Sequence, residues 1–363
     1  MAKSKIQSND PLLFLHEICK VFIKKLDEIE PRQLDSDLLW TYIQKHKVEA
    51  IVNKVNQTHN LGLSDVLKLE IQQLTQNRFI RKMYVLKEIL EIQKAHEVQN
   101  IFVIPYKGIA IGSMFYKDIN LRDFVDVDFA IEEQHIGQSA EIMKSLGYVE
   151  EKGESNFQDL KKSRSYHIDY SWLKFDENNN VLCSAEIHWQ PTNSALYSPT
   201  KFFNLKTSSQ LTLILSKEIR LFSKVDNLYY LILHHGLVDN WFQLRHMVDL
   251  YLSLQTFNSD DILVLEKKLK EKKALYAYYY GVQLCKDLLD ADFENIKVPQ
   301  LLFYKTYHRK VLSGDLEGKW SENKQKLLYY LILRDSHIDR LSAIIQFCKY
   351  LVRELKFKII SNN

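Results

Sequence analysis

The chain has 363 residues, 46% of them hydrophobic and 26% charged, a composition that is typical of a globular protein and excludes a disordered one. It contains no apolar stretch of about 18 residues, so we expect no membrane-spanning helix, and its polar start lacks the apolar core of a signal peptide. The net charge of +3 permits a polyphosphate or nucleic-acid partner without requiring one. The four cysteines form no CxxC pair, which predicts reduced thiols and a cytoplasmic protein.

The first part of the chain has the spacing of amphipathic helices. Apolar residues recur every three or four positions over 12–26, 37–52 and 64–98, which is the period of a helix with one buried face. We therefore predict an N-terminal helical region over residues 1–98.

A segment of mixed strands and helices follows over 99–195. The predicted strands lie at 101–104, 124–131, 167–175 and 181–188, and the predicted helices lie at 109–116 and 136–146. From about residue 201 the pattern is helical again to the end, which predicts a C-terminal helical domain over 196–363. The fold class is therefore α+β, with a small mixed sheet flanked by two helical regions.

Two aspartates one residue apart are the most informative feature of the chain. Asp126 and Asp128 lie in the otherwise apolar run 124–131. Because strand side chains alternate, both carboxylates point to one face, with their Cα atoms about 7 Å apart. Two unpaired carboxylates in a core strand would cost several kcal/mol, a cost that a divalent cation offsets. The competing interpretation is an edge strand whose aspartates face water.

Two further positions are suited to a phosphate and metal site. Lys107-Gly108 lies between a predicted strand and a predicted helix, where backbone N–H groups can bind a phosphate and the lysine adds a charge. Gly112-Ser113 is a second glycine element, but it falls one turn inside the helix, so we favour Lys107-Gly108. Glu186 is acidic among apolar strand residues. It is either a third metal-binding carboxylate or the partner of an Arg or Lys in the sheet.

These motifs and several later ones occur in a definite order. They are Tyr106-Lys107-Gly108, Met114-Phe115-Tyr116, Leu121-Arg122-Asp123, Asp126-Val127-Asp128-Phe129, Gly147-Tyr148, His167, Glu186-Ile187-His188-Trp189, His234-His235-Gly236, Trp241, Leu244-Arg245 and Asp249-Leu250. In this order the chain resembles the uncharacterised bacterial nucleotidyltransferase family of the polymerase-β-like superfamily, over about residues 78–255. One departure is Glu186, where the family usually has aspartate, although a longer carboxylate can still reach a metal.

The resemblance implies an enzyme that moves a nucleoside monophosphate from an NTP, ATP by default, to an acceptor hydroxyl. It implies that Asp126, Asp128 and Glu186 are catalytic and bind two Mg²⁺ ions, for which Mn²⁺ can substitute. The residues assigned to the nucleotide are Lys107, Gly108, Arg122, Ser113 and Arg245. A small molecule, a peptide, a protein and an RNA all remain open as acceptors. The alternative is a degenerate module that binds nucleotide or a partner protein without catalysis.

Several polar residues also have simpler interpretations. Arg245 and Asp249 are spaced to form an ion pair on a helix surface, unless Arg245 leans over the nucleotide. His188 is expected to be a buried histidine that supports the site, although a zinc pair with His167 is conceivable. His235 shares the face of apolar helix residues, so its ring is expected to be buried and hydrogen-bonded.

Overall fold

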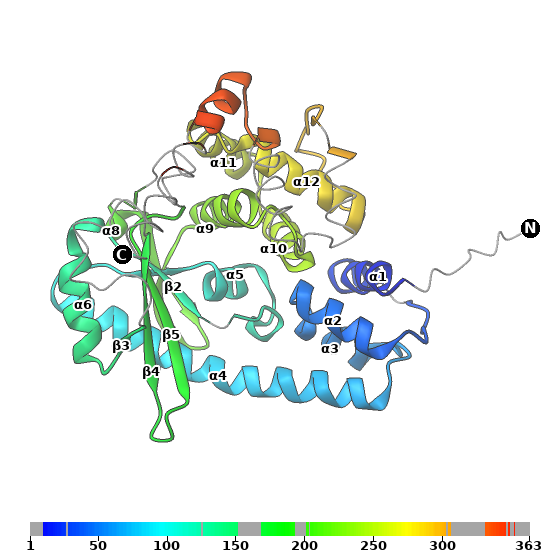
Figure 1. Cartoon of the computed structure of the whole chain (residues 1–363), viewed down its shortest axis with the longest axis horizontal. Helices are drawn as coiled ribbons and strands as arrows, with labels where there is room; N and C mark the ends of the chain where they lie inside the picture. Colours follow the sequence, from blue (N-terminus) through cyan, green and yellow to red (C-terminus); the bar gives the residue numbers. More distant parts are fainter. Residues whose placement is uncertain are drawn as a thin grey trace, which may run out of the picture.

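The computed structural model describes residues 10–26, 28–124, 126–151, 168–192, 201–202, 204–302, 304–305, 331–345, 348 and 352. Within these ranges a mixed β-sheet lies at one side of the molecule and helices cover and flank it (Figure 1). The predicted α+β fold class is therefore confirmed. None of the helices within these ranges is long and apolar enough to cross a membrane.

The N-terminal region consists of helices. They are α1 (Pro11–Lys24), α2 (Ser36–His46), α3 (Glu49–Thr58) and the long α4 (Asp65–Val98). Side chains of Asp10, Asp35 and Ser64 cap α1, α2 and α4 by accepting hydrogen bonds from N–H groups of the first turn. The prediction of one helix over 37–52 is wrong, because Lys47 adopts a left-handed conformation with φ of 52° and ends α2 before α3 begins.

The central segment forms the sheet. Its strands are β1 (Ile104–Tyr106), β2 (Val127–Ala130), β3 (Val149–Glu150), β4 (Asp169–Phe175) and β5 (Val181–His188), in the spatial order β1-β2-β5-β4-β3. Between them lie α5 (Gly108–Phe115), η1 (Ile119–Leu121), η2 (Glu133–His135) and α6 (Ile136–Ser145). Strands β2 and β5 are parallel, and the other neighbours are antiparallel. Strand β1 begins at Ile104, not at residue 101, and includes Pro105, which an edge strand tolerates.

The two faces of this sheet differ in chemistry. Val127 and Phe129 of β2 are buried in an apolar cluster with residues of β5, α4 and α6. Figure 1 shows α4 running past the sheet to the N-terminal helices, where it packs along α3. Because side chains alternate along a strand, Asp128 between these two apolar residues points to the opposite face. That face is turned toward the C-terminal helices, since the ring of Tyr106 on β1 lies 5.9 Å from the ring of Tyr230.

The C-terminal region contains a two-stranded hairpin as well as helices. In chain order the elements are α8 (Leu205–Ser208), β6 (Ser209–Ile214), β7 (Lys217–Phe222), α9 (Lys224–Ile232), the π-helical turn η4 (Leu233–Val238), α10 (Leu244–Leu254), α11 (Ser259–Glu271) and α12 (Leu275–Leu289). The expectation of helix throughout this region is therefore wrong at 209–222. The turn residues Leu215 and Ser216 both have positive φ, 46° and 64°, as in a two-residue type I′ hairpin turn.

One apolar core joins the two helical regions. Phe14 of α1 and Ile51 of α3 belong to the same buried cluster as Leu231 of α9, Met247 of α10 and Tyr278 of α12. The N-terminal helices therefore pack directly on the C-terminal ones. The boundary predicted between residues 195 and 196 lies outside the described residues.

Candidate active site

The register of the sheet brings Asp128, Glu186 and His188 together. Asp128 lies opposite Glu186 in the parallel pair β2–β5, and His188 follows two residues later on the same face. One ligand atom of each residue lies within 4.8 Å of the others. Asp169, the first residue of β4, lies opposite His188 in the antiparallel pair β4–β5. Three carboxylates therefore surround one imidazole on the face toward the C-terminal helices.

His188 lies at the centre of this group. Its Nε2 atom is 2.9 Å from Asp128 Oδ1 and 3.2 Å from Glu186 Oε2, and its Nδ1 atom is 3.3 Å from Asp169 Oδ2. Burial and the Lys107 ammonium lower the pKa of His188, but the three carboxylates outweigh them and raise it to about 9. The carboxylates thus favour the protonated imidazole, and the supporting role of His188 stays a prediction.

A second cation, Lys107, faces Asp128. Its Nζ atom lies 2.7 Å from Asp128 Oδ1, and only 8% and 10% of the two side chains are exposed. Burial alone would raise the pKa of Asp128, but Lys107 and His188 outweigh it and hold the pKa well below its usual range. Asp128 is therefore ionised, and a lysine and a histidine balance its charge.

The Lys107-Gly108 pair occupies the junction between β1 and α5, where the sequence placed it. Lys107 has a φ of 58°, a conformation that costs a non-glycine residue about 1–3 kcal/mol and that clusters at functional sites. Helix α5 begins at Gly108, and among the described residues no side chain caps it. Its first N–H groups are thus suited to an anion. A methyl group on Gly108 would come within 2.8 Å of Phe124 Cβ, so close packing requires glycine here.

Asp126 precedes β2 and is half-buried. Burial raises its pKa, and the carboxylates of Asp128 and Glu186 raise it further. The same causes act on Asp169, whose pKa is raised by burial and by Glu186 although His188 opposes the shift. These carboxylates therefore repel one another, and the two nearby cations neutralise only part of their charge.

This set of donors fits a hard divalent cation. Mg²⁺ prefers carboxylate oxygens, and a two-metal site uses carboxylates that bridge the ions. Asp128 and Glu186 are adjacent in register, whereas Asp126 lies before β2 and is not in the group of described residues whose ligand atoms converge, although the carboxylates of the other two oppose its ionisation. A cation bound by these three residues would relieve the repulsion that raises the pKa of Asp126.

Ser113 lies inside α5 and contacts its own helix. Its hydroxyl donates a hydrogen bond to the Ala110 carbonyl at 3.1 Å. The neighbouring Gly112 faces the loop after the helix, since a Cβ atom there would lie 3.4 Å from Arg122 Cβ. The preference for Lys107-Gly108 as the phosphate-facing element stays a prediction.

Arg122 is held in a buried ion pair. Its Nη2 atom lies 3.0 Å from Asp249 Oδ2 and its Nε atom 3.4 Å from Asp249 Oδ1, while Tyr116 donates from its hydroxyl to Oδ1 at 2.7 Å. Arg122 Nη1 also donates to the Asp123 carbonyl at 3.0 Å. The guanidinium therefore ties the loop before β2 to α10.

Arg245 binds the same loop. Its Nη1 atom donates to the Asp123 carbonyl at 3.1 Å, the oxygen that Arg122 also contacts. The predicted surface ion pair of Arg245 with Asp249 is wrong, because Asp249 is fully buried and, within the described ranges, the arginine that binds it is Arg122. Burial and the Arg122 charge lower the pKa of Arg245 to about 10. The two arginines thus hold the backbone next to the aspartate motif.

Two charged residues near this group were not predicted from the sequence. One is Asp169, which lies opposite His188 at the start of the β4–β5 hairpin. Pairing the two strands of the predicted hairpin is the step that could have identified it. Lys47 is the other. Burial and Arg245 lower its pKa, while the carboxylates of Asp239 and Asp126 oppose the shift, so this lysine lies within electrostatic range of the site. No local pattern identifies it, since it comes from the N-terminal helices. His167 lies outside the described residues.

The chain has an extensive match among protein families and a weak one among solved structures. A solved structure of the antibiotic-resistance factor ANT(2'')-Ia is similar, with 13% identity and a TM-score of 0.36 over 52% of this chain and 92% of that one. No curated protein matches the chain. The model of the family described as uncharacterised nucleotidyltransferase matches residues 32–290. Since this match covers most of the 363 residues, the chain belongs to the uncharacterised nucleotidyltransferase family.

Proposed function

We propose that the protein transfers a nucleoside monophosphate from an NTP, by default ATP, to a hydroxyl group in a reaction that requires Mg²⁺. The observation that carries the proposal is the pairing of Asp128 with Glu186 across β2 and β5, next to the Lys107-Gly108 junction. In this reaction the acceptor oxygen bonds to the α-phosphorus, its proton is released, and pyrophosphate leaves. Family membership supports nucleotidyl transfer in general, and the acceptor remains open.

The acidic and the basic side chains of the site have different roles in the proposed reaction. Asp126, Asp128 and Glu186 would hold the divalent cations through their oxygens. When bound, these ions lower the pKa of the acceptor hydroxyl and neutralise charge on the triphosphate. His188 and Lys107 are already within 2.9 and 2.7 Å of Asp128, so they fix the orientation of that carboxylate. We assign the outer phosphates to Lys107 and to the N–H groups that begin at Gly108.

The other residues that were predicted to bind the nucleotide have a different role in this proposal. Arg122 and Arg245 both bind the Asp123 carbonyl, which places the backbone of the aspartate motif. Ser113 bonds within α5. We therefore assign these three residues to positioning rather than to direct phosphate contact.

The test is transfer of radioactive label from α-³²P-labelled NTPs to components of a cell extract, with Mg²⁺ and with EDTA, followed by mass spectrometry of the labelled product. We expect label on one class of acceptor and stoichiometric pyrophosphate release, both abolished by EDTA. Label that appears equally with the Asp128→Asn variant would contradict the proposal.

Replacing Glu186 by glutamine is expected to stop transfer with little loss of stability. Glu186 is 31% exposed on its side chain, and among the described residues its ion-pair partner is His188, not a lysine or arginine. The free energy of unfolding, measured without metal, should therefore change little. Glu186→Asp should keep substantial activity, since the nucleotidyltransferase family that the chain resembles usually has aspartate at this position.

The control for Glu186 is Glu88→Gln on α4. Glu88 pairs with Lys174 at 2.8 Å and accepts a hydrogen bond from Tyr148 at 2.9 Å, away from the sheet's acidic face. This variant should lose stability and keep its activity per folded molecule. The opposite pattern, with Glu186→Gln unstable and still active, would make Glu186 a structural residue.

Replacing Lys107 by methionine is expected to weaken NTP binding more than NMP binding. The substitution removes a charged donor to the outer phosphates, which NMP lacks, and a charge-assisted hydrogen bond contributes about 1.5–3 kcal/mol. Isothermal calorimetry with both nucleotides measures the difference. Lys174→Met, which removes an ion-paired lysine elsewhere, should leave both affinities unchanged. Equal losses for NTP and NMP in Lys107→Met would assign the lysine to Asp128 alone.

A nucleotide-binding module without catalysis is the second candidate. The observation that favours it is that Lys107 and His188 already balance the charge of Asp128, as expected of a carboxylate that needs no metal. In that case calorimetry would show NTP binding while no label is transferred under any condition.

A further inference from the structure

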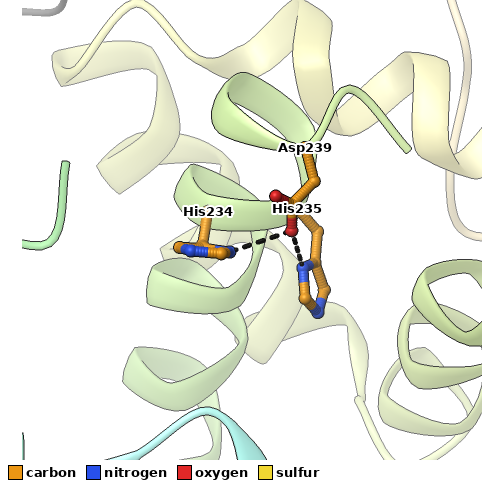
Figure 2. Close-up of side chains that lie close together, drawn as sticks. All are labelled: His234, His235 and Asp239. Atoms are coloured by element: carbon orange, nitrogen blue, oxygen red, sulfur yellow. Dashed lines mark hydrogen bonds and ion pairs between the residues drawn. The ribbon is translucent and has the colours of Figure 1, made fainter. Parts of the chain in front are cut away.

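A second group of potential metal ligands lies in the C-terminal helices, outside the carboxylate site. His234 Nδ1 lies 3.0 Å and His235 Nδ1 2.9 Å from the same atom, Asp239 Oδ2 (Figure 2). The ligand atoms of the three residues all lie within 4.8 Å of one another. We propose that His234, His235 and Asp239 bind one divalent transition-metal ion of the zinc class.

The π-helical turn η4 produces this convergence. In a regular α-helix, consecutive residues point about 100° apart, so two adjacent histidines could not face one aspartate. Here the wider turn closes with a hydrogen bond from the Asp239 N–H to the His234 carbonyl at 3.0 Å, five residues apart. Residues four and five positions before Asp239 therefore both reach it. Such π-helical insertions occur frequently at functional sites.

The surroundings hold this turn rigidly. Trp241 follows it with a positive φ of 57°, and its indole N–H donates to the Ala277 carbonyl at 2.8 Å. Gly281 leaves room for that indole, since a Cβ atom there would lie 2.7 Å from the ring. Rigid support of this kind is what a preformed ligand set requires.

The surroundings of His235 favour a metal over a simple polar network. Its Nδ1 atom lies 2.9 Å from Asp239 Oδ2, whereas its buried Nε2 atom lies 3.5 Å from Asp249 Oδ2 and forms no hydrogen bond with the described residues. A neutral imidazole has one N–H group and can donate to only one of these carboxylates. With a metal on Nδ1, the N–H group would be on Nε2, beside Asp249, which would resemble the carboxylate–histidine–metal arrangement common in metalloproteins. The competing explanation is an imidazolium that bridges both carboxylates.

A neighbouring ring fixes the orientation of His235. The imidazole of His246 stacks on that of His235, with ring centroids 3.8 Å apart and an interplanar angle of 15°. The plane of the His235 ring is therefore set by packing as well as by Asp239.

The types of ligand determine which class of ion the group would bind. Two imidazole nitrogens with one carboxylate suit Zn²⁺, Co²⁺ or Ni²⁺, whereas Mg²⁺ prefers an all-oxygen set. Three protein ligands leave at least one coordination position for water or another group. The side chains of His234 and Asp239 are 28% and 31% exposed, so the group lies close to the protein surface.

Cobalt binding to the metal-free, full-length protein tests the proposal. The Asp128–Glu186–His188 group could also bind Co²⁺, so the reference protein carries Glu186→Gln and His188→Gln. We expect this protein to bind one equivalent of Co²⁺ by equilibrium dialysis, with visible d–d absorption and no displacement by a large excess of Mg²⁺. Adding Asp239→Asn or His235→Gln should weaken binding at least tenfold.

The controls separate the possible results. His135→Gln removes a histidine outside the group and should leave the affinity unchanged. If circular dichroism shows that Asp239→Asn does not fold, His234→Gln, at the more exposed of the two histidines, makes the same comparison. Absence of Co²⁺ binding in the reference protein, or unchanged affinity in the folded ligand variants, would overturn the proposal and support the bridging imidazolium. Neither result depends on nucleotidyl transfer, so the proposed function is tested separately.

Discussion

Replacing either Asp126 or Asp128 by asparagine is expected to abolish nucleotidyl transfer, with opposite effects on the stability of the free protein. Loss of a metal-binding carboxylate removes several kcal/mol of transition-state stabilisation, which corresponds to about a hundredfold or more in rate. Both variants should therefore lose transfer to this extent in the labelling assay.

The stabilities differ because the two carboxylates have different surroundings. The pKa of Asp126 is raised by burial and by the carboxylates of Asp128 and Glu186, so its charged form costs stability at neutral pH. Asp126→Asn removes that cost and should raise the free energy of unfolding. Asp128, in contrast, is ion-paired with Lys107 and His188, and Asp128→Asn leaves these buried cations without a counter-charge. Breaking a buried pair in this way costs about 3–5 kcal/mol.

Urea denaturation of both variants without metal measures this difference. The dependence on pH gives a second readout. Stability contributed by Asp128, whose folded pKa is lowered, is present above the unfolded pKa of about 3.9 and is lost as the pH falls below it. In Asp128→Asn this acid-dependent loss should be smaller. Equal stability changes in the two variants would contradict the different environments assigned to them.

Much of the site could be predicted because its parts are local. The alternation of β2 placed Asp128 on one face, and the strand–helix junction placed Lys107-Gly108, without knowledge of the tertiary structure. The pairing of Asp128 with Glu186 required the parallel register of β2 and β5, which neither strand encodes alone. For the same reason Asp169 was not predicted as part of the site, since only the strand pairing that puts it opposite His188 identifies it.

The errors in the fold have a common cause. Lys47 ends α2 and Leu215-Ser216 turns the β6–β7 hairpin, and all three residues have positive φ. Glycine and asparagine usually occupy such positions. Because these residues are neither, the sequence contains no turn signal there. Other predicted boundaries, such as those of α4 and the β4–β5 hairpin, agree closely because caps and alternation mark them.

Replacing Arg122 by methionine is expected to destabilise the protein by about 3–5 kcal/mol, because it leaves Asp249 as an unpaired buried charge. Only 4% of the Arg122 side chain and none of the Asp249 side chain is exposed. The two residues are 127 positions apart and join the loop before β2 to α10. The resemblance to the nucleotidyltransferase family implied that Arg122 binds the nucleotide, and the sequence alone does not reveal its pairing with Asp249.

A double-mutant cycle distinguishes the structural role of Arg122 from phosphate binding. Arg122→Met with Asp249→Leu removes both charges, so it should recover part of the stability lost in Arg122→Met, since uncharged pairs can replace buried ion pairs at little cost. Arg220→Met is the matched control: its pair with Glu97 is 22% and 42% exposed, and such surface pairs contribute at most about 1 kcal/mol. Denaturation measures the stabilities, and calorimetry on the folded variants measures NTP affinity. If Arg122→Met were as stable as the wild type and bound NTP more than tenfold more weakly, the guanidinium would be a phosphate ligand. With the geometry found here, the loss should instead lie in stability, because both sides of the guanidinium already bind Asp249 and the Asp123 carbonyl.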